Sequence, residues 1–113
     1  MRIDAIGYLR RDVSGVRQSW DEVQIRSLAK RLGYNLRKIV TFTGEVDDVG
    51  LRLRNIAERL CVDAVFVPGI DHFDGRSVPA VLVGIVDVII VEPEYTYARW
   101  ASGELPAELG DGR

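Results

Sequence analysis

Short apolar runs alternate along this chain with longer segments in which apolar residues recur at helical spacing. The first run, Ile3–Leu9, is almost continuously apolar, which is typical of a strand buried on both faces of a sheet. Three further runs are rich in β-branched residues and predict strands over Leu36–Phe42, Ala64–Val67 and Asp87–Val91. The pattern therefore predicts a sheet of four or five strands.

Helices are predicted in the intervals between these strands. In the first interval Ser19 and Glu22 have the spacing of a capping box, and Gly33 is the residue expected just past the helix end. Trp20 falls on the apolar stripe of this helix, so we expect it in the core, with an exposed interface position as the alternative. The rest of the stripe consists of Val23, Ile25, Leu28, Ala29 and Leu32.

Two later helices complete the alternation. Asp47 or Asp48 caps the second helix, and the third, over 78–84, is apolar all round and is therefore predicted to be buried. The core face of the second helix contains Leu53, Ile56, Ala57 and Leu60. Strands that alternate with helices in this way predict an α/β fold of three layers, with helices on both faces of a mostly parallel sheet.

We expect one domain over residues 1–100 and a mobile tail over 101–113, where Gly and Pro are frequent. In mostly parallel sheets, ligands bind beyond the carboxyl ends of the strands. The loops 10–18, 43–49 and 69–77 therefore form the predicted functional crevice.

The composition restricts the classes of function. With 113 residues and a net charge of −2, the chain has no overall charge that would draw it to DNA or to an anionic membrane. Charges close to the N-terminus argue against a signal peptide, and the apolar stretch 78–91 is too short to span a bilayer. Cys61, the single cysteine, is predicted to be a small buried residue, and no Cys/His set indicates a metal or cofactor. We expect a cytoplasmic protein.

Four short motifs occur in order along residues 3–92. They are Tyr8-Leu9-Arg10-Arg11-Asp12, Gln24-Ile25-Arg26-Ser27-Leu28 followed by Gly33, Asp47-Asp48-Val49-Gly50-Leu51, and Ile70-Asp71-His72-Phe73-Asp74-Gly75-Arg76-Ser77. Together they resemble the catalytic domain of the serine recombinases, the resolvase/invertase family. That resemblance implies a resolvase-like fold and a phosphoryl transfer in which a serine attacks a DNA phosphate and arginines neutralise the developing charge.

The chain departs from the family pattern at the positions that carry this chemistry. Asp12 stands where the nucleophilic serine belongs, and Asp48 and His72 each replace an arginine. Ser14, two residues late, is a nucleophile only if the end of the strand bulges. The family-equivalent catalytic positions are Arg10, Asp12, Ser14, Asp71 and Arg76.

Two classes of function remain open. The first is a degenerate recombinase-like domain without recombinase activity that associates with itself, with an intact recombinase or with another protein. Its candidate anchors are Trp20, Tyr95, Tyr97 and Trp100. The second is residual DNA-phosphate binding or strand transfer, for which the candidate ligands are Arg10, Arg11, Arg17, His72 and Arg76. A variant of the second class has Mg²⁺ held by clustered carboxylates, namely Asp12, Asp48, Asp71 and Asp74.

Overall fold

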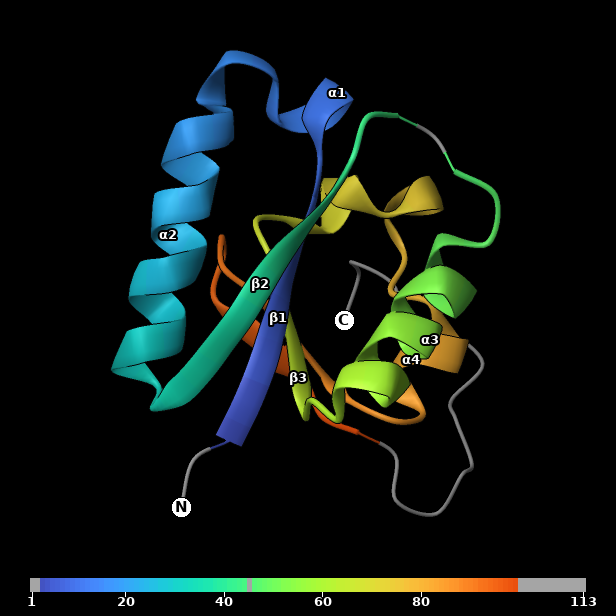
Figure 1. Cartoon of the computed structure of the whole chain (residues 1–113). Coiled ribbons are helices and arrows are strands. Elements are labelled where there is room, and N and C mark those ends of the chain that lie inside the picture. Colours follow the sequence, from blue (N-terminus) through green and yellow to red (C-terminus); the bar gives the residue numbers. More distant parts are fainter. Residues whose placement is uncertain (1–2, 45, 100–113) are drawn as a thin grey trace.

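The computed structural model describes residues 3–44 and 46–99, which form one mixed sheet with helices on both of its faces (Figure 1). The strands are β1 (Ile3–Arg10), β2 (Tyr34–Phe42), β3 (Ala64–Val67), β4 (Asp87–Ile90) and β5 (Tyr95–Tyr97). Their order across the sheet is β2-β1-β3-β4-β5; β1 to β4 run parallel, and β5 is antiparallel to β4. The predicted three-layer α/β architecture with a mostly parallel sheet is confirmed.

The helices are α1 (Arg11–Ser14), α2 (Gln18–Arg31), α3 (Val49–Leu60) and α4 (Ala80–Val83). Short 3₁₀ turns occur at Gly15–Arg17, Ile70–His72 and Asp74–Arg76. Helix α2 covers one face of the sheet, and α3 and α4 cover the other (Figure 1).

Alternate residues of the central strands supply two cores. Ala5 and Leu9 of β1, with Phe66 of β3, pack against α2. Ile6 and Tyr8, with Val65 and Val67, pack on the opposite face against α3 and α4. This two-residue alternation explains why β1 reads as a continuous apolar run in the sequence: both of its faces are buried.

The start of α2 differs from the prediction. The helix begins at Gln18, Ser19 lies inside it, and no side chain caps its first turn. The capping-box prediction is therefore wrong. Oε2 of Glu22 instead accepts a hydrogen bond from the side-chain amide of Gln18, at 3.0 Å. The physical reason is that α1 and the 3₁₀ turn lead directly into α2, so the chain is already helical where an extended cap residue was expected.

The apolar stripe predicted for α2 combines two opposite faces. Ile25, Leu28 and Ala29 are buried against the sheet, as expected. Trp20 and Val23 lie on the solvent side, and each is 55% exposed. The expectation that Trp20 is a core residue is therefore wrong, because one helix face already supplies enough apolar surface to cover this side of the sheet.

Three further details correct the sequence reading. Cys61 is exposed and not buried, because it ends α3 in the left-handed conformation at φ 55°. Asp48 precedes α3 as predicted, but it too is left-handed and makes no side-chain cap. The third helix, α4, is shorter than predicted and buried on one side only, since Val81 faces solvent. Gly33, at φ 85°, ends α2 as predicted.

The sheet order places a topological switch point between β1 and β3. The connection through α2 carries the chain from β1 to β2 at one edge, and α3 returns it across β1 to β3. Loops that leave the carboxyl ends of β1 and β3 therefore diverge to opposite faces and open a crevice between them, which is the usual ligand position in such sheets. Both the loop after Arg10 and the loop after Val67 start here.

The packing of α3 on the segment before α4 predicts a stability effect at Gly50. A Cβ at Gly50 would lie 2.4 Å from Cβ of Pro79, whereas a Cβ at Gly44 would meet no atom within 4 Å. We expect Gly50→Ala to lower the free energy of unfolding by about 1–3 kcal/mol because the rigid proline ring cannot yield. Gly44→Ala is the matched control, and its free energy of unfolding should stay within about 0.5 kcal/mol of the wild-type value. Equal denaturation midpoints for the two variants would contradict this packing.

Candidate functional site

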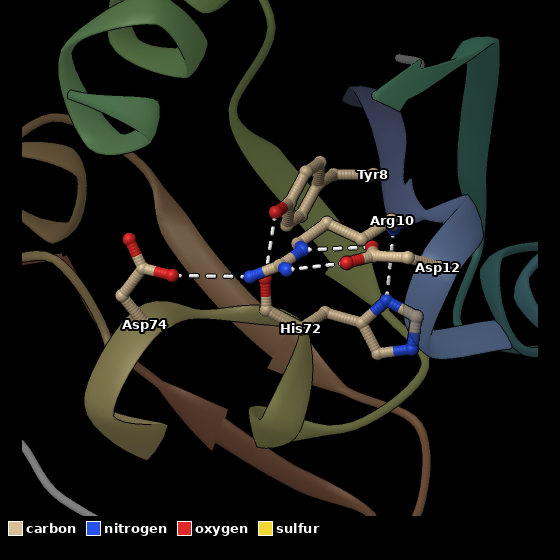
Figure 2. A network of polar contacts seen from close by, with 5 residues as sticks. All are labelled: Tyr8, Arg10, Asp12, His72 and Asp74. Atoms are coloured by element: carbon tan, nitrogen blue, oxygen red, sulfur yellow. Dashed lines mark hydrogen bonds and ion pairs between the residues drawn. The ribbon is translucent and has the colours of Figure 1, made fainter. Parts of the chain in front are cut away.

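Arg10, the last residue of β1, is held between two carboxylates (Figure 2). Its Nε and Nη2 donate to Oδ1 and Oδ2 of Asp12 at 3.0 and 2.6 Å, and its Nη1 donates to Oδ1 of Asp74 at 3.0 Å. The Arg10 side chain is only 15% exposed. The guanidinium lowers the pKa of Asp12 through this hydrogen-bonded pair, so Asp12 stays ionised in the neutral range.

His72 connects the end of β1 to the turn after β3. The backbone N–H of Arg10 donates to Nδ1 of His72 at 2.9 Å, and the Tyr8 hydroxyl donates to the His72 carbonyl at 2.6 Å. Because Nδ1 accepts a hydrogen bond, the neutral imidazole carries its proton on Nε2. Burial lowers the pKa of His72 from its ordinary value of 6.5; the carboxylates of Asp71 and Asp21 oppose this shift.

The Arg10 cluster is poorly suited to bind phosphate. Three of the guanidinium donors already contact carboxylates, and the cluster of Arg10, Asp12 and Asp74 carries one net negative charge. A phosphate would have to displace a carboxylate from a bidentate pair and then accept the repulsion of that carboxylate. In the described part of the chain, Arg10 acts as a structural cation that orders the end of β1.

Ser14 lies in a different environment from Arg10. It is buried in α1, and its Oγ donates to Oδ2 of Asp21 at 2.6 Å, which ties α1 to α2. It lines a pocket of about 190 Å³ at the carboxyl ends of the strands. The pocket is formed by Val13, Ser14, Arg17, Asp21, Pro68, Gly69, Asp71, His72 and Glu92, and Arg10 is not among its lining residues.

The structure distributes the predicted site residues over three places. Arg10 and Asp12 lie in the cluster with Asp74, while Ser14, Arg17 and Asp71 lie around the pocket. His72 contributes to both. Arg76, at φ 51°, lines a separate depression of about 420 Å³ together with Tyr95 and Tyr97.

The remaining predicted site residues lie at the surface. Arg11 is exposed and donates through Nε to the Gln18 side chain at 3.3 Å. Tyr95 is exposed and Tyr97 is half-buried, and their rings meet edge to face with centroids 4.8 Å apart. Trp100 and the predicted tail, 101–113, lie outside the described residues. Within residues 3–44 and 46–99, no group of three or more His, Cys, Asp or Glu side chains is placed to hold a metal ion.

Sequence reasoning missed the roles of Asp21 and Glu92. The spacing of Ser19 and Glu22 gives Asp21 no role, and the partner of Asp21, Ser14, lies seven positions earlier in α1. Glu92 follows β4 by two residues, so its position at the carboxyl edge of the sheet was a usable signal.

Comparisons with known proteins add no assignment. No family model matches the chain, and no curated protein has significant sequence similarity to it. Among the described helices, none is both long and apolar enough to cross a membrane.

The buried neutral state of His72 predicts a pH dependence of stability. The folded protein binds fewer protons at this site than the unfolded chain, because the folded pKa is the lower one. The stabilisation is therefore complete above pH about 6.5 and is lost as the pH falls through and below that value. His72→Gln keeps a carbonyl acceptor for the Arg10 N–H but removes the titration.

We expect the denaturation midpoint of the wild-type chain to decrease as the pH is lowered from about 7.5 to about 5.5. The midpoint of His72→Gln should change less over the same pH range. His72 is the single histidine in the sequence, so no other imidazole contributes to the difference. Parallel curves for the two proteins would show that His72 is not held neutral by the fold.

Proposed function

We propose that this chain is a resolvase/invertase-like domain that does not cleave DNA and acts by associating with a second copy of itself through the outward face of α2. The observation that carries the proposal is an exposed apolar stripe formed by Trp20 and Val23 on that face and by Val16 in the 3₁₀ turn just before α2. The motif resemblance supports the proposed family, and the exposed stripe supports association as the mode of action.

The stripe has the properties of an association surface. Trp20 and Val23 are three residues apart and lie side by side on the face of α2 opposite its buried side, and the exposed Val16 precedes them in the 3₁₀ turn Gly15–Arg17. Exposed apolar side chains that lie next to one another, rimmed by polar residues, are a feature of association surfaces. Tryptophan is among the residues most enriched at the energetic centres of protein interfaces.

The charges on α2 favour a second copy as the partner. Asp21 is bound to Ser14, so the acidic charge of the N-terminal half of the helix that is left for a partner is that of Glu22; the C-terminal half carries Arg26, Lys30 and Arg31. Two copies of α2 packed antiparallel about a two-fold axis place the acidic half of each against the basic half of the other. Val23 then lies close to the two-fold axis, and Trp20 packs on either side of it.

The absence of cleavage is supported by the surroundings of Arg10. The family-equivalent nucleophile position holds Asp12, and that carboxylate pairs with the arginine expected to stabilise the transition state. Loss of one preorganised electrostatic stabiliser costs a factor of about 10²–10³ in rate. Here the nucleophile is replaced and the remaining cation is neutralised.

Residual DNA-phosphate binding or strand transfer is the second candidate. It is favoured by the shared position of Ser14, Arg17 and His72 around one pocket at the carboxyl edge of the sheet. Three carboxylates also line that pocket, so its balance of charge opposes an incoming phosphate. Self-association therefore has the stronger support.

Sedimentation velocity over a range of protein concentrations tests the proposal. We expect the wild-type chain to form a dimer and Trp20→Ser to weaken the dimer at least about 30-fold, the effect of losing a Trp anchor worth about 2 kcal/mol. Leu51→Ser is the matched control, because Leu51 is an exposed apolar residue of α3 on the opposite face of the sheet.

A wild-type chain that stays monomeric at every concentration would contradict self-association. A Trp20→Ser variant that dimerises as well as the wild type would show that another surface is used. Dimer formation should also weaken as NaCl is raised, because the paired halves of α2 carry opposite charges.

A further inference from the structure

The pocket beside His72 lies between the end of β1 and the loops that follow β3 and β4. Its volume of about 190 Å³ is several times that of one water molecule and is suited to a small organic molecule. The proposed self-association through the outward face of α2 uses none of the groups that line this pocket. The pocket is therefore a separate candidate for ligand binding.

His72 presents an unused donor to this pocket. The residue is only 3% exposed, and its Nδ1 is occupied by the Arg10 backbone N–H. Nε2, on the other side of the ring, points away from the Arg10 cluster and has no hydrogen-bond partner among the described residues (Figure 2). No fully enclosed side-chain polar atom in the described part of the chain lacks a partner, so Nε2 is open to the pocket that His72 lines.

The carboxylate of Asp71 is placed in the pocket by the absence of a side chain at Gly69. A Cβ at Gly69 would lie 2.8 Å from Oδ1 of Asp71, so only glycine lets the carboxylate lie against the backbone there. Among the residues described, Asp71 has neither a hydrogen bond nor an ion pair at its carboxylate. It is a second group in the pocket whose hydrogen-bonding capacity is unused.

The charges around the pocket determine whether it favours a positively or a negatively charged ligand. Asp21, Asp71 and Glu92 supply three negative charges against one positive charge from Arg17, and His72 is neutral. An anion would meet a net negative wall, whereas a cation would find carboxylate acceptors. The Nε2–H of His72 is a donor that is satisfied by an acceptor on the same molecule.

We propose that this pocket binds a small molecule that carries a primary ammonium group next to a hydrogen-bond acceptor, as amino alcohols and amino acids do. The ammonium contacts the carboxylate of Asp71, and the neighbouring oxygen accepts from Nε2–H of His72. Asp21, already bound to the Ser14 hydroxyl, adds negative charge without leaving its structural role.

Chemical-shift titration of the ¹⁵N-labelled full chain with 2-aminoethanol tests this assignment, with acetate as a probe of opposite charge. We expect shifts of the Gly69, Asp71 and His72 amides with 2-aminoethanol and none there with acetate. Asp71→Asn should weaken binding about tenfold or more through loss of a charge-assisted hydrogen bond. Arg17→Gln should strengthen it, because removal of a positive charge makes the pocket more negative.

Asp63→Asn is the matched control: Asp63 is an exposed carboxylate at the opposite end of β3, and its loss should leave binding unchanged. Shifts with acetate in place of 2-aminoethanol would overturn the proposal, as would no shift with 2-aminoethanol at any concentration that leaves the fold intact. Equal affinities of the wild type and Asp71→Asn would also overturn it. Sedimentation of the unliganded chain reports the proposed association separately, so failure of one proposal leaves the other measurable.

Discussion

The hydrogen bond from the Arg10 backbone N–H to Nδ1 of His72 ties the end of the central strand to the turn after its neighbour β3. The Tyr8 hydroxyl reinforces this connection by donating to the His72 carbonyl from within the core. Burial raises the pKa of the Tyr8 phenol well above its ordinary value, so the hydroxyl remains a donor. These two hydrogen bonds fix the position of the imidazole at the topological switch point, and the backbone N–H of Arg10 determines its tautomer.

The His72 side chain lies between two groups of side chains that the motif resemblance treats as one site. On one side, Arg10 is neutralised by Asp12 and Asp74; on the other, Ser14 and Asp71 face a small acidic pocket. An arginine held between two carboxylates orders a loop and attracts an anion only weakly, because its charge is already neutralised. Asp12, which stands at the position of the expected nucleophile, is therefore also the carboxylate that pairs with Arg10, the expected catalytic cation.

Much of the fold was predictable because it depends on periodicity. The strand Ala64–Val67 was predicted to the residue, since both of its neighbours are buried strands and its ends are marked by polar and proline positions. The orientation of α2 was not predictable, because Trp20 and Ile25 both fit a helical apolar pattern. Only packing against the sheet decides which face of the helix is covered. Burial of Cys61 was mispredicted because its left-handed backbone depends on how α3 ends.

The candidate site was only partly predictable for a related reason. The sequence indicates which loops meet at the carboxyl edge, and Arg10, Asp71 and His72 do lie there. It does not indicate which carboxylate pairs with which cation, because Arg10 reaches Asp74 across 64 positions and Ser14 reaches Asp21 across two helices. These pairings arise from the three-dimensional packing of short polar loops, for which one sequence has no periodic signal.

The central claim is that Arg10 is a structural cation and not a ligand for phosphate. A backbone amide NMR titration with a short DNA duplex at low and at moderate salt tests it most directly. The account predicts no salt-sensitive shifts clustered on Arg10, Arg17, His72 and Arg76. Arg10 is paired with carboxylates, Arg17 and His72 line a pocket with a net negative charge, and Arg76 lines a separate depression. Salt-sensitive shifts concentrated on these four residues would contradict it and would show that a phosphate site is preserved.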